Sequence, residues 1–360
     1  METGLDKKAP KAAYLQLYEQ LKRDITARHY EYGHRLPSKR STAADKGVSV
    51  ITVEHAYALL CEEGYVEARE RSGYFVIYKP ADFLAARETA LAPSVTPAVS
   101  GASGEFPYSL LAKKMRKVLS EQGERLLVKS PNRGCLELRT ALCAYLARSI
   151  GIEVRPAQIV VGSGAEYLYS MVVQLLGKER IFALEKPGYE MIRRVYEANG
   201  VRCEALPLGA DGIRSAALAR TNATVLHVTP FNSFPSGVSA DASKRREYID
   251  WALGRDGYIV EDNYDSELTV SKKFDDTLFS SAGQSRVLYL NTFSQTIAPS
   301  LRVGYMLLPA SLLEDFEEKL GFYSCPVPVF EQLLLAELLQ SGDFERHINR
   351  VRRQKRKLRE

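Results

Sequence analysis

The sequence predicts a small α+β domain followed by a larger α/β domain with a mostly parallel sheet. Helical patterns near the N-terminus lead into two short β-rich runs, at residues 65–68 and 74–78. From about residue 107, short β-branched runs alternate with helical patterns, which is typical of a parallel sheet buried on both faces. A stretch rich in Ala, Ser, Pro, Thr and Gly separates the two parts. We therefore expect a head at residues 1–78, a flexible linker at 79–106 and a body at 107–360.

Composition narrows the possible classes of protein. The chain has 360 residues, a net charge of +5 and 26% charged residues, which are ordinary values for a globular protein. It contains no apolar run long enough for a membrane span, and its N-terminus lacks the apolar core of a signal peptide, so a cytoplasmic location is expected. The five cysteines form no CxxC pair, which indicates reduced thiols and no metal site.

The head is expected to contain three helices and a two-stranded wing. Tyr14, Leu17, Leu21 and Ile25 recur at helical spacing. Ser38 is a favourable N-cap for a short helix at about 39–46, which Gly47 ends. Ser49 begins a longer helix that ends near Gly64, and a charged turn at 69–73 joins the two strands. This order of elements predicts a winged helix-turn-helix.

The segments RLPSKR, GVSVITVEHAYALLCEEGY and RSGYFV resemble the GntR family of bacterial regulators over residues 13–76. The resemblance implies a domain that binds double-stranded DNA, with the second helix of the pair in the major groove. It places Lys39 and Arg40 facing DNA, Ser49 and Thr52 on phosphates, and Arg71 and Gly73 on the wing. Capping alone also explains Ser49, and the arginines could be ordinary surface charges.

Val50 departs from the family pattern. Many members carry Arg directly after the serine that begins the recognition helix, where this chain has Val50. An arginine there can read a guanine edge and a valine cannot. The family's operator sequences therefore do not transfer to this chain.

In the body, the candidate ligand residues follow the predicted strands. Ligands of parallel sheets bind at the carboxyl ends of the strands. Ser163, Gly164 and Ala165 follow the strand at 158–162 and open a helix, whose backbone N–H groups form an anion site. Tyr189 follows the next strand and could lie on a flat heterocycle, although a core tyrosine is the simpler interpretation.

Later strand ends carry charged and hydroxyl groups. Asp262 could pair with a protonated pyridine nitrogen, and Tyr264 could hydrogen-bond a phenolic oxygen on the same ring. Thr292, Ser294 and Arg302 offer two hydroxyls and a guanidinium, which suit a phosphate.

The body as a whole resembles the aminotransferase-like domain of the MocR/GabR subfamily of GntR regulators, from about Phe106 onward. The matching motifs are LELRTALCAYLARS, VGSGA, EKPGY, TPFNSFPSG, VEDNYDSEL and NTFSQTIAPSLRVGYMLLP. The resemblance implies the fold of type I pyridoxal 5'-phosphate (PLP) transferases, the cofactor PLP, and a homodimer with cofactor sites at the subunit boundary. Asn232 and Ser233 depart from the usual His and Gln before FPxG.

Gln295 stands where the family has the Schiff-base lysine, in TFSQTIAPSLRVGY. An amide nitrogen is neither a nucleophile nor a useful base, so we predict no catalytic residue and no enzyme activity. Three explanations stay open: an engineered change, a natural domain that binds PLP or its adduct with an amine noncovalently, and decay of an unused site. The chain also ends at KRKLRE inside a predicted helix, where the family continues into a small C-terminal subdomain with an arginine for the substrate carboxylate. We therefore expect either a truncated fragment or a missing carboxylate site.

These patterns favour a DNA-binding transcriptional regulator whose body senses PLP or an amine–PLP adduct. Its expected partners are an operator, a second copy of the chain and an amine or amino-acid effector. A PLP-dependent aminotransferase and a ligand-free dimerisation scaffold are the alternatives.

Overall fold

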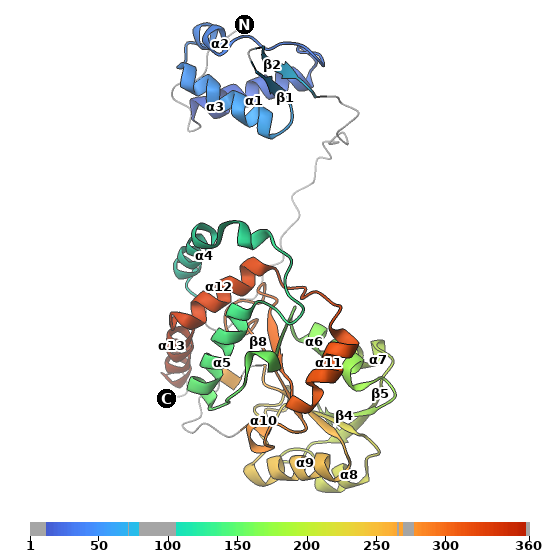
Figure 1. Ribbon diagram of the computed structural model, residues 1–360. Helices are drawn as coiled ribbons and strands as arrows, with labels where there is room; N and C mark the ends of the chain where they lie inside the picture. The colour runs from blue at the N-terminus through green and yellow to red at the C-terminus, as the bar shows by residue number, and fades with distance from the viewer. Residues whose placement is uncertain (1–11, 71, 79–105, 265, 269–276, 358–360) are drawn as a thin grey trace. The chain divides into compact units, whose positions relative to one another are not determined.

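A computed structural model describes residues 12–70, 72–78, 106–264, 266–268 and 277–357 (Figure 1). The chain divides into two compact units, Met1–Pro97 and Ala98–Glu360, which are described separately. The predicted linker lies almost wholly outside the described residues, so the boundaries at 78 and 106 stay predictions.

The head contains the predicted three helices and two strands. They are α1 (Ala13–Thr26), α2 (Lys39–Lys46), α3 (Val50–Glu62), β1 (Val66–Arg69) and β2 (Gly73–Val76), with the strands antiparallel. Ser38 Oγ accepts a hydrogen bond from Ser41 N, and Ser49 Oγ accepts one from Thr52 N, each at 3.1 Å. Gly47 ends α2 with φ of 63°. The capping signals in the sequence therefore set the helix bounds.

The core of the head fixes α3 against the other two helices. Leu17, Leu21 and Ile25 of α1 pack with the buried stripe of α3. The hydroxyl of Tyr57, at the centre of that stripe, is 2.8 Å from Thr42 Oγ1 and donates to the Pro37 carbonyl at 2.9 Å. These contacts hold α2 and α3 in a fixed pair and leave the opposite side of α3 exposed.

The body is built on a sheet of seven strands among the described residues, in the order β3-β9-β8-β7-β6-β4-β5. The strands are β3 (Ile159–Gly162), β4 (Ile181–Lys186), β5 (Arg202–Pro207), β6 (Val225–Val228), β7 (Tyr258–Asp262), β8 (Val287–Thr292) and β9 (Gly304–Leu307). Only β9 is antiparallel to its neighbours, which confirms the mostly parallel sheet. The carboxyl ends of the other strands therefore meet at one edge.

Helices cover both faces of this sheet (Figure 1). Ile159 and Val161 of β3 belong to one core with α5, α9, α12 and α13, whereas Val160 belongs to the other with α6, α7 and α11. The described helices are α4 (Tyr108–Gln122), α5 (Leu136–Ile150), α6 (Ala165–Leu176), α7 (Glu190–Ala198), α8 (Ser215–Arg220), α9 (Ala242–Gly254), α10 (Leu278–Ser281), α11 (Leu313–Leu320), α12 (Val329–Gln340) and α13 (Asp343–Lys357).

Three features are absent from the part of the chain that the structure describes: a membrane-spanning helix, a cluster of metal ligands and a disulfide bond. No helix there combines the length and apolarity that crossing a lipid bilayer requires. No group of three or more His, Cys, Asp or Glu side chains there could hold a metal ion. The five cysteines are free thiols.

Candidate functional site

The carboxyl edge of the sheet holds a cavity of about 280 Å³. Most of the predicted ligand residues line it: Ala165, Tyr189, Asp262, Tyr264, Thr292, Ser294, Gln295 and Arg302. Glu166, Tyr169, Ile192, Thr229 and Phe234 complete the wall. Residues separated by more than a hundred positions in sequence thus converge because β3, β7 and β8 end at the same edge.

Ser163 and Gly164 do not line this cavity, but Gly164 supports one of its walls. Gly164 has φ of 90°, and a Cβ atom there would lie 2.9 Å from Arg302 Nη2. The absence of a side chain therefore lets the guanidinium lie against the first turn of α6.

Arg302 is already paired with a carboxylate that the sequence interpretation missed. Its guanidinium donates to Glu166, one residue into α6, and both side chains are about half exposed. Ser294 Oγ donates to the Leu301 carbonyl at 3.2 Å and so belongs to the same rim. This end of the cavity is polar, and its positive charge is partly neutralised.

Asp262 lies at the buried end and is only 3% exposed. The hydroxyl of Tyr169 donates to its Oδ2, and His227 Nε2 lies 3.5 Å from the same oxygen. On the far side of the imidazole, Nδ1 is 2.7 Å from the hydroxyl of buried Tyr196. Because a carboxylate only accepts, the tautomer that fits has its proton on Nε2 and accepts from Tyr196.

Tyr169, His227 and Tyr196 are functional candidates that the sequence interpretation missed. Burial, reinforced by the charge of Asp262, raises the pKa of Tyr169 well above its usual value, and burial does the same for Tyr196. Both phenols therefore stay protonated and able to donate. Only their positions in the sequence pointed weakly to the site. Tyr169 lies one helical turn after Ala165, and His227 lies one residue before the end of β6.

Tyr189 and Gln295 lie at the open side of the cavity. Tyr189 is 50% exposed, and its ring meets that of Phe234 edge-on, with centroids 6.0 Å apart. Gln295 is exposed, and Tyr264 is half-buried. The tyrosine at 189 thus forms a wall and is no core residue, contrary to the simpler interpretation of the sequence.

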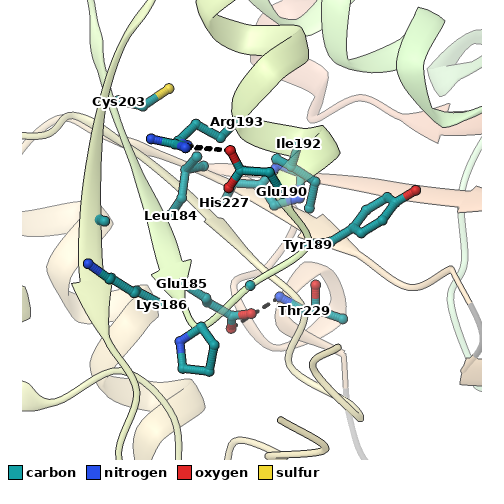
Figure 2. Close-up of a pocket in the computed structure, with 13 residues that line it drawn as sticks. Leu184, Glu185, Lys186, Tyr189, Glu190, Ile192, Arg193, Cys203, His227 and Thr229 are labelled. Atoms are coloured by element: carbon teal, nitrogen blue, oxygen red, sulfur yellow. Dashed lines mark hydrogen bonds and ion pairs between the residues drawn. The ribbon is translucent and has the colours of Figure 1, made fainter. Parts of the chain in front are cut away.

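A second cavity, of about 380 Å³, adjoins the first and shares Tyr189, Ile192 and Thr229 with it. Figure 2 shows Glu185 hydrogen-bonded to Thr229, and Arg193 paired with Glu190, whose side chains are both half exposed. Ser233 Oγ also donates to Glu185, at 2.6 Å. Burial raises the pKa of Glu185 to about 7 and that of Cys203 to about 11, so the thiol here is a poor nucleophile.

The predicted DNA-binding residues lie on the head, with one outside the described residues. Lys39 Nζ pairs with Glu54 on α3 at 2.7 Å, and Arg40 is exposed. Ser49 caps α3, and its hydroxyl is 2.8 Å from Thr52 Oγ1. Gly73 begins β2 with φ of 109°, and Arg35, which the sequence interpretation missed, packs against it. Arg71 lies outside the described residues.

Comparison with known proteins agrees with this division. Residues 13–76 match the model for bacterial regulatory proteins of the gntR family, and residues 100–360 match that for aminotransferase class I and II. The chain is 33% identical to the uncharacterized HTH-type transcriptional regulator YdeL of Bacillus subtilis, covering 96% of this chain and 77% of YdeL. It is 29% identical to the probable rhizopine catabolism regulatory protein MocR of Rhizobium meliloti, covering 97% of this chain and 76% of MocR.

A solved structure also resembles the body. LysN, the α-aminoadipate aminotransferase of Thermus thermophilus, was crystallised with N-(5'-phosphopyridoxyl)-L-leucine. It aligns with a TM-score of 0.59 and 29% identity over 70% of this chain and 66% of LysN. The match to YdeL over nearly the whole chain, together with the two family segments in this order, shows that the protein belongs to the MocR/GabR subfamily of GntR transcriptional regulators, in which an aminotransferase-like domain follows the helix-turn-helix domain.

Proposed function

We propose that this regulator binds an operator through its head and holds PLP, free or as an adduct with a small amine or amino acid, noncovalently in the body. The observation that carries the proposal is the cavity at the carboxyl edge of the sheet, where groups suited to each part of PLP line the wall together with an amide, Gln295. PLP would supply an electron-withdrawing ring and an aldehyde that combines with primary amines.

The residues of the cavity fit the cofactor. Asp262 is a buried carboxylate with one oxygen engaged by Tyr169, and it suits a protonated ring nitrogen. Arg302, Ser294 and Thr292 suit the phosphate, and the exposed ring of Tyr189 suits a flat heterocycle. Glu166 opposes an anion at this end, because its carboxylate already pairs with Arg302.

Gln295 determines how the ligand would be held. Its side-chain nitrogen shares its lone pair with the carbonyl and cannot attack an aldehyde. The amide still donates and accepts hydrogen bonds, so it can orient the ligand without a covalent bond. The adduct bound to LysN is a phosphopyridoxyl amino acid, which supports the same ligand class for this cavity.

The head supports recognition of DNA by a pair of subunits. Its α2–α3 pair corresponds to the helix-turn-helix, whose second helix, here α3, enters the major groove in proteins of this kind. A homodimer of the body would supply two such heads for two half-sites. Effector binding in the body would then change how the two heads are positioned for the two half-sites.

Cofactor binding is tested by titrating the full chain with PLP and following thermal unfolding. The transition temperature should rise with PLP concentration, because the ligand binds the native state. After borohydride reduction and denaturation, the polypeptide should carry no cofactor mass, whereas Gln295→Lys should carry one. A cofactor mass on the unmodified chain would contradict noncovalent binding. The absence of any thermal response would favour the scaffold alternative, and steady conversion of an amino acid to its keto acid would favour the aminotransferase.

DNA binding is tested by titrating the full chain against a selected operator and a scrambled duplex at several salt concentrations. The affinity should fall linearly with salt on logarithmic axes, because phosphate contacts release counterions. Equal affinity for both duplexes with no salt dependence would refute the regulator function.

A further inference from the structure

The exposed side of α3 begins with two apolar side chains. Val50 is 42% exposed and Ile51 is 64% exposed. At 100° per residue, Ile51 lies about 170° around the helix from the centre of the buried stripe. It therefore projects directly away from the core of the head.

The position of these side chains coincides with the part of the element that meets bases. In a helix-turn-helix domain, the N-terminal residues of the second helix contact base edges in the major groove. Val50 and Ile51 are the first two residues of α3. Because Cβ atoms point toward the N-terminus of a helix, both side chains cover its tip.

The polar groups around this tip are engaged with one another. The hydroxyl of Ser49 caps the helix and contacts Thr52 Oγ1 at 2.8 Å. Glu54, one turn after Val50, pairs with Lys39 of α2 at 2.7 Å. Val50 and Ile51 are therefore the exposed side chains at the tip that hold no hydrogen bond or ion pair with the rest of the head.

We propose that Val50 and Ile51 read thymine through its 5-methyl group. This inference rests on the proposed operator binding by the head. Among the four bases, only thymine presents a methyl group in the major groove, and apolar side chains recognise it. Neither side chain has a donor or acceptor for the edges of guanine, cytosine or adenine. The half-sites should therefore carry one or two thymines under the tip of α3.

The experiment begins with selection of duplexes from a random-sequence library by the full chain. Each thymine of the selected site is then replaced by deoxyuridine, which removes the methyl group and keeps the hydrogen-bonding pattern. Affinity should fall about fourfold at the thymines under α3, which corresponds to losing one buried methyl group. Substitution elsewhere in the site should change little.

Protein variants assign this effect to α3. Ile51→Ala should remove most of the difference between thymine and deoxyuridine at one position, in a double-mutant cycle. Val50→Arg should shift the selected sequence toward guanine. Phe322→Ala, which removes a 75% exposed side chain of the body, is the control and should keep the wild-type difference.

The outcomes separate this inference from the function on which it rests. If the unmodified chain shows no salt-dependent DNA binding, the proposed function fails and the inference fails with it. If the chain binds a selected site but tolerates deoxyuridine at every position, only the methyl readout is overturned. The same holds if Ile51→Ala keeps the full discrimination.

Discussion

At the scale of single residues, Asp262 is a buried and hydrogen-bonded group of the candidate site. Its Oδ2 receives the hydroxyl of Tyr169 and faces His227, while its surroundings exclude water almost completely. A carboxylate held in this way by the hydroxyl of Tyr169 is preorganised to meet a cation.

Asp262→Asn should therefore weaken the binding of PLP. A hydrogen bond to a charged group contributes about 1.5–3 kcal/mol, so the dissociation constant should rise by roughly tenfold to a hundredfold or more. Fluorescence titration of the purified variant measures this change. An unchanged dissociation constant would exclude Asp262 as the partner of the ring nitrogen.

Glu166→Gln is the matched control, because it makes the same chemical change at the other end of the cavity. It releases Arg302 from its carboxylate partner. PLP affinity should rise instead of falling, by a few fold for a partly exposed ion pair. A loss of affinity in both variants would indicate general damage to the cavity.

Glu185 should make the stability of the body depend on pH. Burial raises its pKa from the ordinary 4.5 to about 7, so the folded state binds the proton more tightly than the unfolded state. Its contribution to stability is complete below about pH 4.5 and is lost as the pH rises through 7. The free energy of unfolding of the wild type, relative to Glu185→Gln, should fall over this range.

Denaturant unfolding followed by the fluorescence of Trp251 measures this difference, because the chain has one tryptophan and it lies in the body. Glu261 has a pKa raised to about 7 by burial as well, so both proteins should keep some pH dependence. A difference between them that stays constant from pH 4.5 to 8 would contradict the assignment to Glu185.

The sequence predicted the site residues that directly follow strands and missed those that reach the site from elsewhere. Asp262, Thr292 and Ser294 stand at strand ends, so the rule for parallel sheets finds them. Tyr169 and His227 lie inside a helix and a strand. The packing of α6 on the sheet brings Tyr169 to Asp262, and the pairing of β6 with β7 brings His227 there. The ion pair between Glu166 and Arg302 spans 136 positions and has no local signal.

At the scale of elements, capping residues that are visible in the sequence determine the helix ends of the head. In the body, tertiary contacts determine which strands and side chains come together. Ser38 and Ser49 are N-caps and Gly47 is a C-cap, and these residue types alone predict the observed helix bounds. The edge strand β5 has little local signal, because it is only partly buried and its residues alternate weakly.

The turn between β3 and α6 is expected to be sensitive to a side chain. Gly164→Ala places a Cβ atom at a backbone conformation that suits glycine, which costs about 1–3 kcal/mol. It also displaces Arg302, so PLP affinity should fall together with stability. Trp251 fluorescence in denaturant and a PLP titration measure the two effects.

Gly177→Ala separates these contributions. Gly177 has a similar φ of 95°, and a Cβ atom there would meet nothing within 4 Å. This variant should lose a comparable amount of stability and keep its affinity for PLP. Equal PLP affinity in both variants would show that Gly164 serves the backbone alone.

At the scale of the whole molecule, the head and the body each have a hydrophobic core of their own. A substitution on the surface of one unit is therefore expected to leave the other unit folded. Alanine at a phosphate-contacting cation should weaken DNA binding evenly across sequences and reduce the salt slope by about one. We expect this result for Arg40→Ala, with PLP binding unchanged. Gel-shift titrations at several salt concentrations measure the slope, and Asp262→Asn, whose slope should be that of the wild type, is the control. A slope that stays at the wild-type value in Arg40→Ala would remove Arg40 from the interface.

The segment between β8 and β9 has one further consequence. The sheet holds it at both ends: Phe293 N donates to the Val303 carbonyl at 2.9 Å, and β9 returns antiparallel beside β8. Gln295 lies within this segment, but its side chain is exposed and does not contribute to holding the segment in place. A single substitution at this position, Gln295→Lys, therefore places a primary amine at the wall of the cavity while the backbone that holds the segment stays intact.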